Sequence, residues 1–249
     1  FVGGTGTDTL SYTGATAGIT LNVTSNGAGT STGDGADTFL NFENYILSDN
    51  ADTANLSGVH GSTINAGALS DTASYSTVGS GTALTVKVNS GNTSAIVTDG
   101  AKIDTLKNIE KIIGGDGNDT FIASNVLGID TLDGDGGTNT LQLSGDIDLS
   151  DVVLLNFNNI TVANGDTLTL NAVNLDGKTM TIELQGSGSL VIVGTTTATD
   201  FDFDNITINN TGASQTGTTT LQLDATVNLV GHNINGTNNI IDEILVNSG

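Results

Sequence analysis

The sequence contains no cysteine and no proline. Without cysteine, disulfides cannot stabilise the fold, and thiol chemistry and cysteine-based zinc sites are excluded. Without proline, turns must be made by glycine, asparagine and aspartate. Aromatic residues make up only 4% of the chain, which is typical of a narrow core that cannot hold many rings. No apolar run is long enough to span a membrane.

Arginine is also absent, and five lysines face 27 acidic residues, so the formal net charge is −22. Such a chain repels nucleic acid and anionic lipid, and it attracts divalent cations. Aspartate accounts for 23 of the acidic residues and glutamate for four. Because a short carboxylate is held close to the backbone, this bias suits turns and metal loops. The composition therefore predicts cation binding and no nucleic-acid partner.

One nine-residue stretch combines glycines with such an aspartate. Residues 114–122 read GGDGNDTFI and fit the pattern G-G-x-G-x-D-x-U-x, where U is a large apolar residue. Glycines let a turn adopt backbone angles that side chains forbid, so that its carbonyl oxygens and the carboxylate of Asp119 can face one hard cation. Phe121 is expected to start the next strand and point into the core. A weaker copy, GGTGTDTLS, occupies residues 3–11, with Asp8 in the same place.

This nonapeptide is the calcium-binding repeat of the RTX (hemolysin-type) proteins, and the chain resembles that family over its first 140 residues. The resemblance implies Ca²⁺ as the bound ion and secretion by a type I system. The long acidic chain, rich in Thr, Asn, Gly and Ala, looks in particular like RTX-like bacterial S-layer proteins. Typical members run several nonapeptides in tandem, whereas this chain has one full copy and scattered degenerate ones. Its calcium sites are therefore expected to be few and irregular.

The first half also contains an internal duplication. Residues 37–54 align with residues 104–121 without a gap at a shift of 67, and residues 8–12 align with residues 71–75 at a shift of 63. The matches include Asp37 with Asp104, Asn41 with Asn108, Glu43 with Glu110, and Asp52 with Asp119. An internal repeat of this size predicts a solenoid or a tandem array.

The second half shows a shorter rhythm. Strand-like pieces begin every 19 to 21 residues, at Leu141, Ile160, Met180, Phe201, Leu221 and Ile240. Apolar residues alternate with Thr, Asn and Gln, which is strand periodicity. The sequence therefore predicts an all-β fold, an elongated parallel β-solenoid (a β-roll or β-helix) with coils of about 20 residues. An antiparallel β-sandwich is the alternative.

A turn cluster, GDGG at residues 134–137, marks the predicted boundary between two regions. Residues 1–136 form the duplicated RTX-like calcium-binding region, and residues 137–249 form the β-solenoid continuation. The strongest metal candidates lie at this boundary, because turns one coil apart stack in a solenoid. They are the carboxylates of Asp116, Asp119, Asp133 and Asp135 with the turn glycines Gly114 and Gly117. Calcium accepts six to eight oxygen ligands in irregular geometry. The alternative is that these are solvated turn aspartates.

A second cluster of candidates belongs to the first copy of the duplication. It contains Asp34, Asp37, Asp49 and Asp52, with the same spacing of 15 from Asp37 to Asp52 as from Asp104 to Asp119. The glycines are partly lost here, so a turn without metal is the competing interpretation. Asp8 is a weaker candidate, and Asp71 and Asp130 are weaker still.

No nucleophile elbow, zinc-protease motif or P-loop is present, so we expect a non-enzymatic protein. The first hypothesis is a secreted S-layer subunit or lattice domain of the bacterial cell surface. Its partners would be copies of itself, joined through calcium, and cell-surface polysaccharide. The alternatives are a repeat segment of a large type I-secreted adhesin and the calcium-binding tail of a secreted enzyme.

Overall fold

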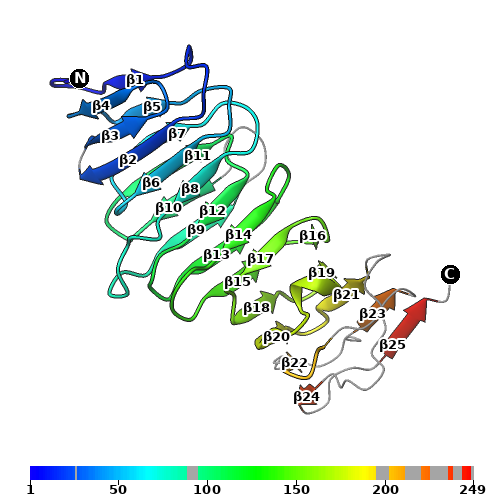
Figure 1. Cartoon of the computed structure of the whole chain (residues 1–249). Helices are drawn as coiled ribbons and strands as arrows, with labels where there is room; N and C mark the ends of the chain where they lie inside the picture. Colours follow the sequence, from blue (N-terminus) through cyan, green and yellow to red (C-terminus); the bar gives the residue numbers. More distant parts are fainter. Residues whose placement is uncertain are drawn as a thin grey trace. The chain divides into compact units, whose positions relative to one another are not determined.

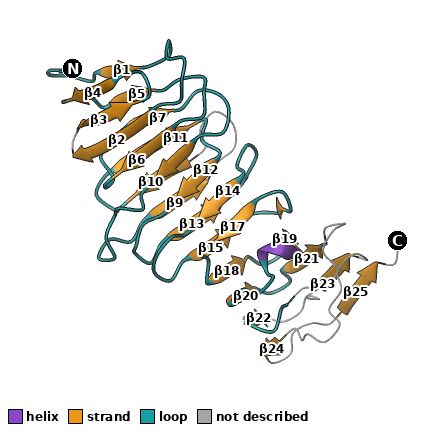
Figure 2. Ribbon diagram, viewed as in Figure 1, coloured by secondary structure: helices purple, strands orange, loops and turns teal. Residues whose placement is uncertain are grey.

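The computed structural model describes residues 1–25, 27–88, 95–194, 202–210, 220–224, 235–237 and 243–247. Within these residues the fold is all-β, as the sequence predicts. Short strands are joined by turns, and the helical structure consists of one 3₁₀ turn, η1 (Ala172–Asn174) (Figure 2). No helix in this part of the chain is long and apolar enough to cross a membrane.

The chain divides into two compact units. The first contains Phe1–Phe121 with Leu127–Asn139, and the second contains Ile122–Val126 with Thr140–Gly249. The sequence predicts a single boundary, between residues 136 and 137.

Two sheets hold the strands of the first unit. In spatial order, the first sheet contains β1 (Thr9–Ser11), β5 (Asn44–Ile46), β7 (Thr63–Asn65), β11 (Ile103–Lys107), β10 (Ala95–Thr98), β9 (Thr85–Val88) and β13 (Thr120–Ala123). The second sheet contains β14 (Thr131–Asp133), β12 (Lys111–Ile113), β8 (Thr72–Ser74), β6 (Thr53–Leu56), β2 (Thr20–Ser25), β3 (Ala28–Thr32) and β4 (Ala36–Phe39). Figure 1 shows β4, β3, β2, β6 and β8 side by side.

Parallel pairing dominates both sheets. Asn44 of β5 pairs with Thr63 of β7, and Thr53 of β6 pairs with Thr72 of β8, an offset of 19 residues in each case. The chain alternates between the sheets, since β5 and β7 lie in the first and β6 and β8 in the second. These strands therefore find a hydrogen-bonding neighbour two strands further along the chain, one coil away.

The core of the first unit lies between the two sheets. Apolar residues alternate with Thr, Asn and Ser along each strand, so one face of every strand is buried. In β6, for example, Ala54 and Leu56 are fully buried. The hydroxyl of Tyr75, which follows β8 in the second sheet, reaches Asp104 of β11 in the first sheet at 3.0 Å. The buried faces of the two sheets thus contact each other.

The duplication seen in the sequence is also present in the backbone. Each copy contains a three-stranded antiparallel meander, β2–β3–β4 in the first and β9–β10–β11 in the second. An asparagine in the left-handed region follows each meander within two residues, Asn41 with φ 61° and Asn108 with φ 53°.

The two copies lie on opposite sheets. From β1 to β8, its counterpart, the chain crosses between the sheets five times (β1 to β2, β4 to β5, β5 to β6, β6 to β7, β7 to β8). Because this number is odd, the first meander belongs to the second sheet and the second meander belongs to the first. The sequence alignment alone could not reveal this exchange.

The second unit also has parallel pairing in two series of strands. One series is β15 (Thr140–Leu143), β18 (Asn159–Val162), β20 (Met180–Leu184), β22 (Ile206–Asn210) and β24 (Asn235–Thr237). The other is β16 (Ile147–Leu149), β19 (Thr167–Asn171), β21 (Ser189–Val193), β23 (Thr220–Asp224) and β25 (Glu243–Asn247). A further strand, β17, spans Val153–Leu155.

The rhythm predicted for this half mixed the two series. Leu141 pairs with Ile160, as expected, but Ile160 then pairs with Ile182 and not with Met180. Leu221 belongs to the other series, where it pairs with Leu190. Phe201 and Ile240 lie outside the described residues. Connections of unequal length shift the register after the first two strands.

The left-handed asparagine in the first copy gives a direct test of this backbone. Asn41→Val should lower the free energy of unfolding by about 1–2 kcal/mol, because a β-branched residue is strained at positive φ. Asn41→Gly should keep or slightly raise it. Chemical denaturation measures both values. An equal loss in the two variants would mean that the side chain of Asn41, rather than its backbone angle, is what matters.

Candidate functional site

The turns that carry the strongest metal candidates lie side by side. The Gly114 N–H donates to the Asp133 carbonyl at 2.8 Å, and the Thr138 N–H donates to Oδ1 of Asn118 at 2.8 Å. These bonds join turn 114–119 to turn 133–139. The structure therefore brings together the two turns in which Asp116, Asp119, Asp133 and Asp135 reside.

The glycines of the first turn have a different role from the one inferred from the sequence. Neither Gly114 nor Gly117 has a positive φ. A Cβ on Gly114 would lie 2.6 Å from Oδ2 of Asp119, and a Cβ on Gly117 would meet the carbonyl of Thr82. These glycines are needed for close packing of neighbouring segments, not for backbone angles that side chains forbid.

Asp119 is buried and is held by backbone amides. Its Oδ1 accepts the Leu84 N–H and its Oδ2 accepts the Gly115 N–H, both at 2.7 Å. Its own N–H donates to Oδ1 of Asn139 at 2.8 Å. Burial raises the pKa of Asp119, the amide hydrogen bonds oppose that rise, and the charge of Asp135 adds to it. Asp119 thus joins segments that are far apart in the sequence.

The other three carboxylates of this pair of turns are more accessible. Asp116 is exposed, and Asp133 and Asp135 are half-buried. Burial raises the pKa of Asp135, and the negative charges of Asp133 and Asp116 raise it further. A bound cation would relieve this repulsion, so the chemistry of the three carboxylates fits a calcium ion, whereas both oxygens of Asp119 already accept hydrogen bonds. Across the described residues, no three acidic or histidine side chains are arranged as a complete metal site.

The first copy of the duplication repeats the arrangement of Asp119. Asp52 is buried, its Oδ1 accepts the Ile19 N–H at 2.5 Å, and its Oδ2 accepts the Ser48 N–H at 2.7 Å. Its own N–H donates to Oδ1 of Asp71 at 2.7 Å. Asp52 therefore corresponds to Asp119, and Asp71 corresponds to Asn139.

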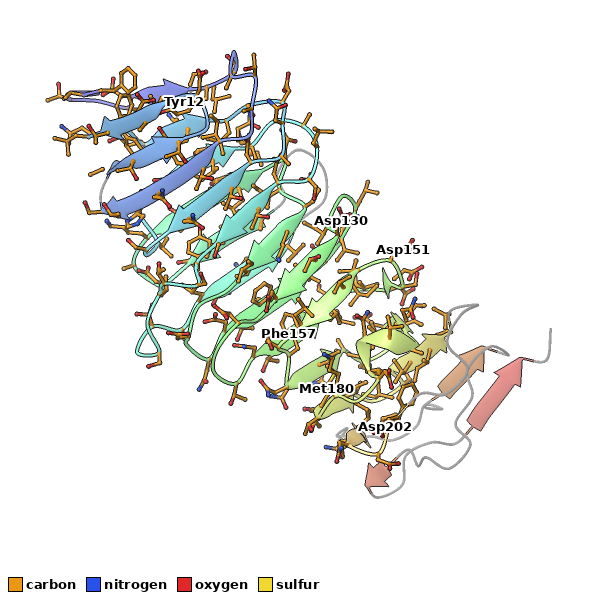
Figure 3. All side chains as sticks on the ribbon, viewed as in Figure 1. Tyr12, Asp130, Asp151, Phe157, Met180 and Asp202 are labelled. Atoms are coloured by element: carbon orange, nitrogen blue, oxygen red, sulfur yellow. The ribbon has the colours of Figure 1, made fainter. Side chains whose placement is uncertain are left out.

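The remaining candidates of the first copy are dispersed. Asp34 and Asp49 are exposed and Asp37 is half-buried. The pKa of Tyr12, which is labelled in Figure 3, is raised by burial and by the charges of Asp37 and Asp34. The N–H of Asp8 donates to Oε2 of Glu43 at 2.9 Å. Among the described residues, the four acids of the second predicted cluster do not form a group that could hold a metal ion.

Asp71 is the most unusual acid in the structure. It is fully buried, and its Oδ2 has no hydrogen-bond partner among the described residues. Burial raises its pKa to about 7, an effect that the hydrogen bond from Asp52 opposes and the charges of Asp52 and Glu110 increase. Beside Asp119, where Asn139 takes the place that Asp71 has beside Asp52, the corresponding atom is Nδ2 of Asn139, which donates to the Gly136 carbonyl at 2.9 Å. The side-chain amide of Asn139 thus makes a hydrogen bond where the carboxylate of Asp71 makes none among the described residues.

Three residues that hydrogen-bond to buried backbone amides were not predicted from the sequence: Asp104, Glu110 and Asn139. Asp104 and Glu110 were matched to Asp37 and Glu43 in the duplication, but their buried hydrogen bonds were not foreseen. Asn139 is absent from the predicted ligands because these were carboxylates and turn glycines, and its side chain is an amide. It occupies the sixth position of GDGGTNTLQ (134–142), where Asp119 stands in its own nonapeptide. Alignment of all the degenerate nonapeptides would have found it.

Comparison with known proteins adds no relative. No family model matches the chain, and a search of curated proteins found no match.

The buried acid predicts a pH dependence of stability. The pKa of Asp71 is about 7 in the folded chain and near 3.8 when unfolded. Between these values the folded state holds a proton that the unfolded state has lost, so stability falls as the pH rises through this window. Asp71→Asn should raise the free energy of unfolding at pH 8 by about 1–3 kcal/mol, because it removes a buried charge with an unpaired oxygen. Denaturation at pH 5 and pH 8 measures the effect.

Asn139→Asp is the reciprocal variant, and it should lose stability at pH 8 more than at pH 5. A loss of the same size at both pH values in Asp71→Asn would show that Asp71 is a charged, fully bonded group.

Proposed function

We propose that this chain is a non-enzymatic structural segment of a secreted bacterial cell-surface protein, of the RTX-like S-layer type, stabilised by calcium. The observation that carries this proposal is the pair of adjacent turns in which the negative charges of Asp133 and Asp116 act on Asp135. The neighbouring copies of this chain would be its partners in a surface lattice.

The strand registers support a parallel β-solenoid as the architecture. Parallel neighbours lie 19 residues apart at Thr53 and Thr72, and again 19 apart at Thr140 and Asn159. The chain alternates between the two sheets of the first unit, so two strands and two turns make one coil of about 20 residues. An antiparallel β-sandwich would not produce parallel registers of this kind.

The carboxylates of the adjacent turns support calcium as the ligand. Asp116, Asp133 and Asp135 would hold the ion, with hard oxygen ligands and room for water. Calcium would supply charge neutralisation and would join turn 114–119 to turn 133–139. With a net charge of −22, a chain that binds cations only when folded gains stability from them by mass action.

The buried acids support a structural rather than a catalytic role. Asp52 and Asp119 direct both oxygens at backbone amides, and Asp104 does so with Oδ1. Carboxylates engaged in this way hold turns in place. A general acid or base would need its carboxyl oxygens within reach of a substrate.

Because calcium is low inside the cell and higher outside, such a chain would be exported before it folds and would fold outside. Without calcium, repulsion among the acids opposes compaction, which suits export through a type I system. Outside the cell, calcium at about 0.1–1 mM would occupy weak extracellular sites and stabilise the fold.

Calcium should therefore raise the melting temperature of the purified chain. At ten times the dissociation constant, binding to the folded state alone adds about 1.4 kcal/mol, which corresponds to a shift of about 3–6 °C. Circular dichroism melts in chelator and in millimolar calcium measure the shift. Identical melting temperatures in the two conditions would refute calcium stabilisation.

Two variants locate the ion. Asp135→Asn should remove most of the calcium-dependent shift, since it deletes a carboxylate at the centre of the proposed group. Asp151→Asn changes the net charge equally but lies far along the chain, and it should retain the shift. A shift that survives Asp135→Asn unchanged would place the ion elsewhere.

Self-assembly can be tested on the same samples. Negative-stain electron microscopy should show ordered two-dimensional sheets after calcium addition and none in chelator. Soluble rods that never form sheets would instead favour the repeat segment of a large adhesin.

A further inference from the structure

The six-residue turns before β6 and β13 hold their final aspartate in the same way. In each turn the N–H of the second residue donates to Oδ2 of the sixth. Ser48 donates to Asp52 at 2.7 Å, and Gly115 donates to Asp119 at 2.7 Å. In neither turn does the second or the fourth residue have a positive φ. We call this arrangement the closed form of the turn.

The turn before β8, residues 66–71, has a different backbone. Its second and fourth residues, Gly67 and Leu69, have φ of 102° and 76°. The same two positions of the turn before β15 are also at positive φ. There the sixth residue, Asn139, donates from Nδ2 to the carbonyl of the third residue, Gly136, at 2.9 Å. We call this the open form, in which the sixth side chain faces a carbonyl instead of an amide.

Asp71 is an acid at the sixth position of an open turn. Its Oδ1 accepts the Asp52 N–H at 2.7 Å, but its buried Oδ2 has no partner among the described residues. In the same turn, the Gly67 N–H makes no hydrogen bond within the described part of the chain. The two groups that are bonded to each other in the closed form are therefore both unused here. Asp8, in a turn whose second residue Gly4 has φ 111°, also has an unbonded Oδ2.

The charged groups that face Asp71 are acids. Asp52 faces it from the preceding turn, and Glu110 faces it from the segment before β12, where its Oε2 accepts the Asp71 N–H at 2.7 Å. Burial raises the pKa of Asp71 to about 7, the hydrogen bond from Asp52 opposes the rise, and the two neighbouring charges add to it. The open form suits a protonated carboxyl, because its O–H can donate to the Ala68 carbonyl as Nδ2 of Asn139 donates to the corresponding carbonyl.

We propose that turn 66–71 is a proton-operated switch between the two forms. With a proton on Oδ2, Asp71 donates to the Ala68 carbonyl and the turn is open. When this O–H bond breaks and the proton passes to water, the turn closes and the Gly67 N–H donates to the charged Oδ2. Closure also moves Leu69 out of positive φ, where a residue with a side chain is strained. The switch is independent of the proposed calcium-dependent function.

Nuclear magnetic resonance of the full chain in chelator tests the switch. From pH 5 to pH 8, the protection of the Gly67 amide against hydrogen exchange should rise roughly tenfold or more after correction for the intrinsic rate, since that N–H becomes bonded to a charged oxygen. The intraresidue HN–Hα NOE of Leu69, which is strong at positive φ, should weaken over the same range. The Gly115 amide, in a turn that is already closed, should show no such rise. Asp71→Asn should hold the turn open and abolish both changes.

Two glycine variants separate a backbone rotation from a simple titration. Leu69→Gly removes the strain of the open form and should raise the pH midpoint of the Gly67 change by about 0.5–1 units. Ser70→Gly gives the same flexibility to an exposed neighbour without a positive φ, and it should leave the midpoint unchanged.

Three results would each overturn the switch. They are equal protection of the Gly67 amide at pH 5 and pH 8, a change that persists in Asp71→Asn, and a midpoint that Leu69→Gly does not move. Because no calcium is present, these outcomes are separate from those of the calcium titration.

Discussion

The fold depends on hydrogen bonds from backbone amides to buried side-chain oxygens that lie far away in the sequence. Asp52 binds the amide of Ile19, and Asp119 binds the amide of Leu84. Most strands here are only three to five residues long, so each contributes few ladder bonds of its own. A charge-assisted bond from a buried carboxylate to an amide is stronger than a neutral one. These bonds hold the turns in place, and the positions of the turns set the register of the parallel strands.

In both copies of the duplication a tyrosine hydroxyl donates to an aspartate, but the two aspartates differ in burial. Both copies use an aspartate and a tyrosine at the meander. Three consecutive backbone amides donate to Oδ1 of Asp104, whereas in the described part of the chain no such group of amides donates to Asp37. The two copies lie on opposite sheets because an odd number of crossings separates them. The aspartate at this repeat position is therefore fully buried in the second copy and half-buried in the first.

An acidic chain with so few lysines has to manage repulsion among its carboxylates. The structure shows one solution at Asp119, where backbone amides surround the charge. A second operates at Asp71, whose pKa of about 7 keeps it largely protonated in mild acid. We propose calcium as the third solution, at the half-exposed carboxylates of Asp133 and Asp135. The three solutions differ in burial, since amides and protons can enter the core whereas a hydrated ion binds at the surface.

The local pattern of the sequence was sufficient to predict the class of fold. The alternation of Thr and Asn with apolar residues predicted strands and the all-β class, and the motif at 114–122 together with the turn at 133–139 pointed to adjacent turns. The duplication was also visible, since Asn41 and Asn108 align by simple shift and share a left-handed backbone.

Tertiary structure decided what each of these residues does. Whether Asp119 faces solvent or the amides of Leu84 and Gly115 depends on partners up to 35 residues away. The sheet assignment of each copy depends on the count of crossings, and the pairing of Ile182 with Ile160 depends on connection length. Periodicity describes which face of a strand is buried. It does not describe which neighbour lies against that face, because register is set by contacts between segments that are distant along the chain.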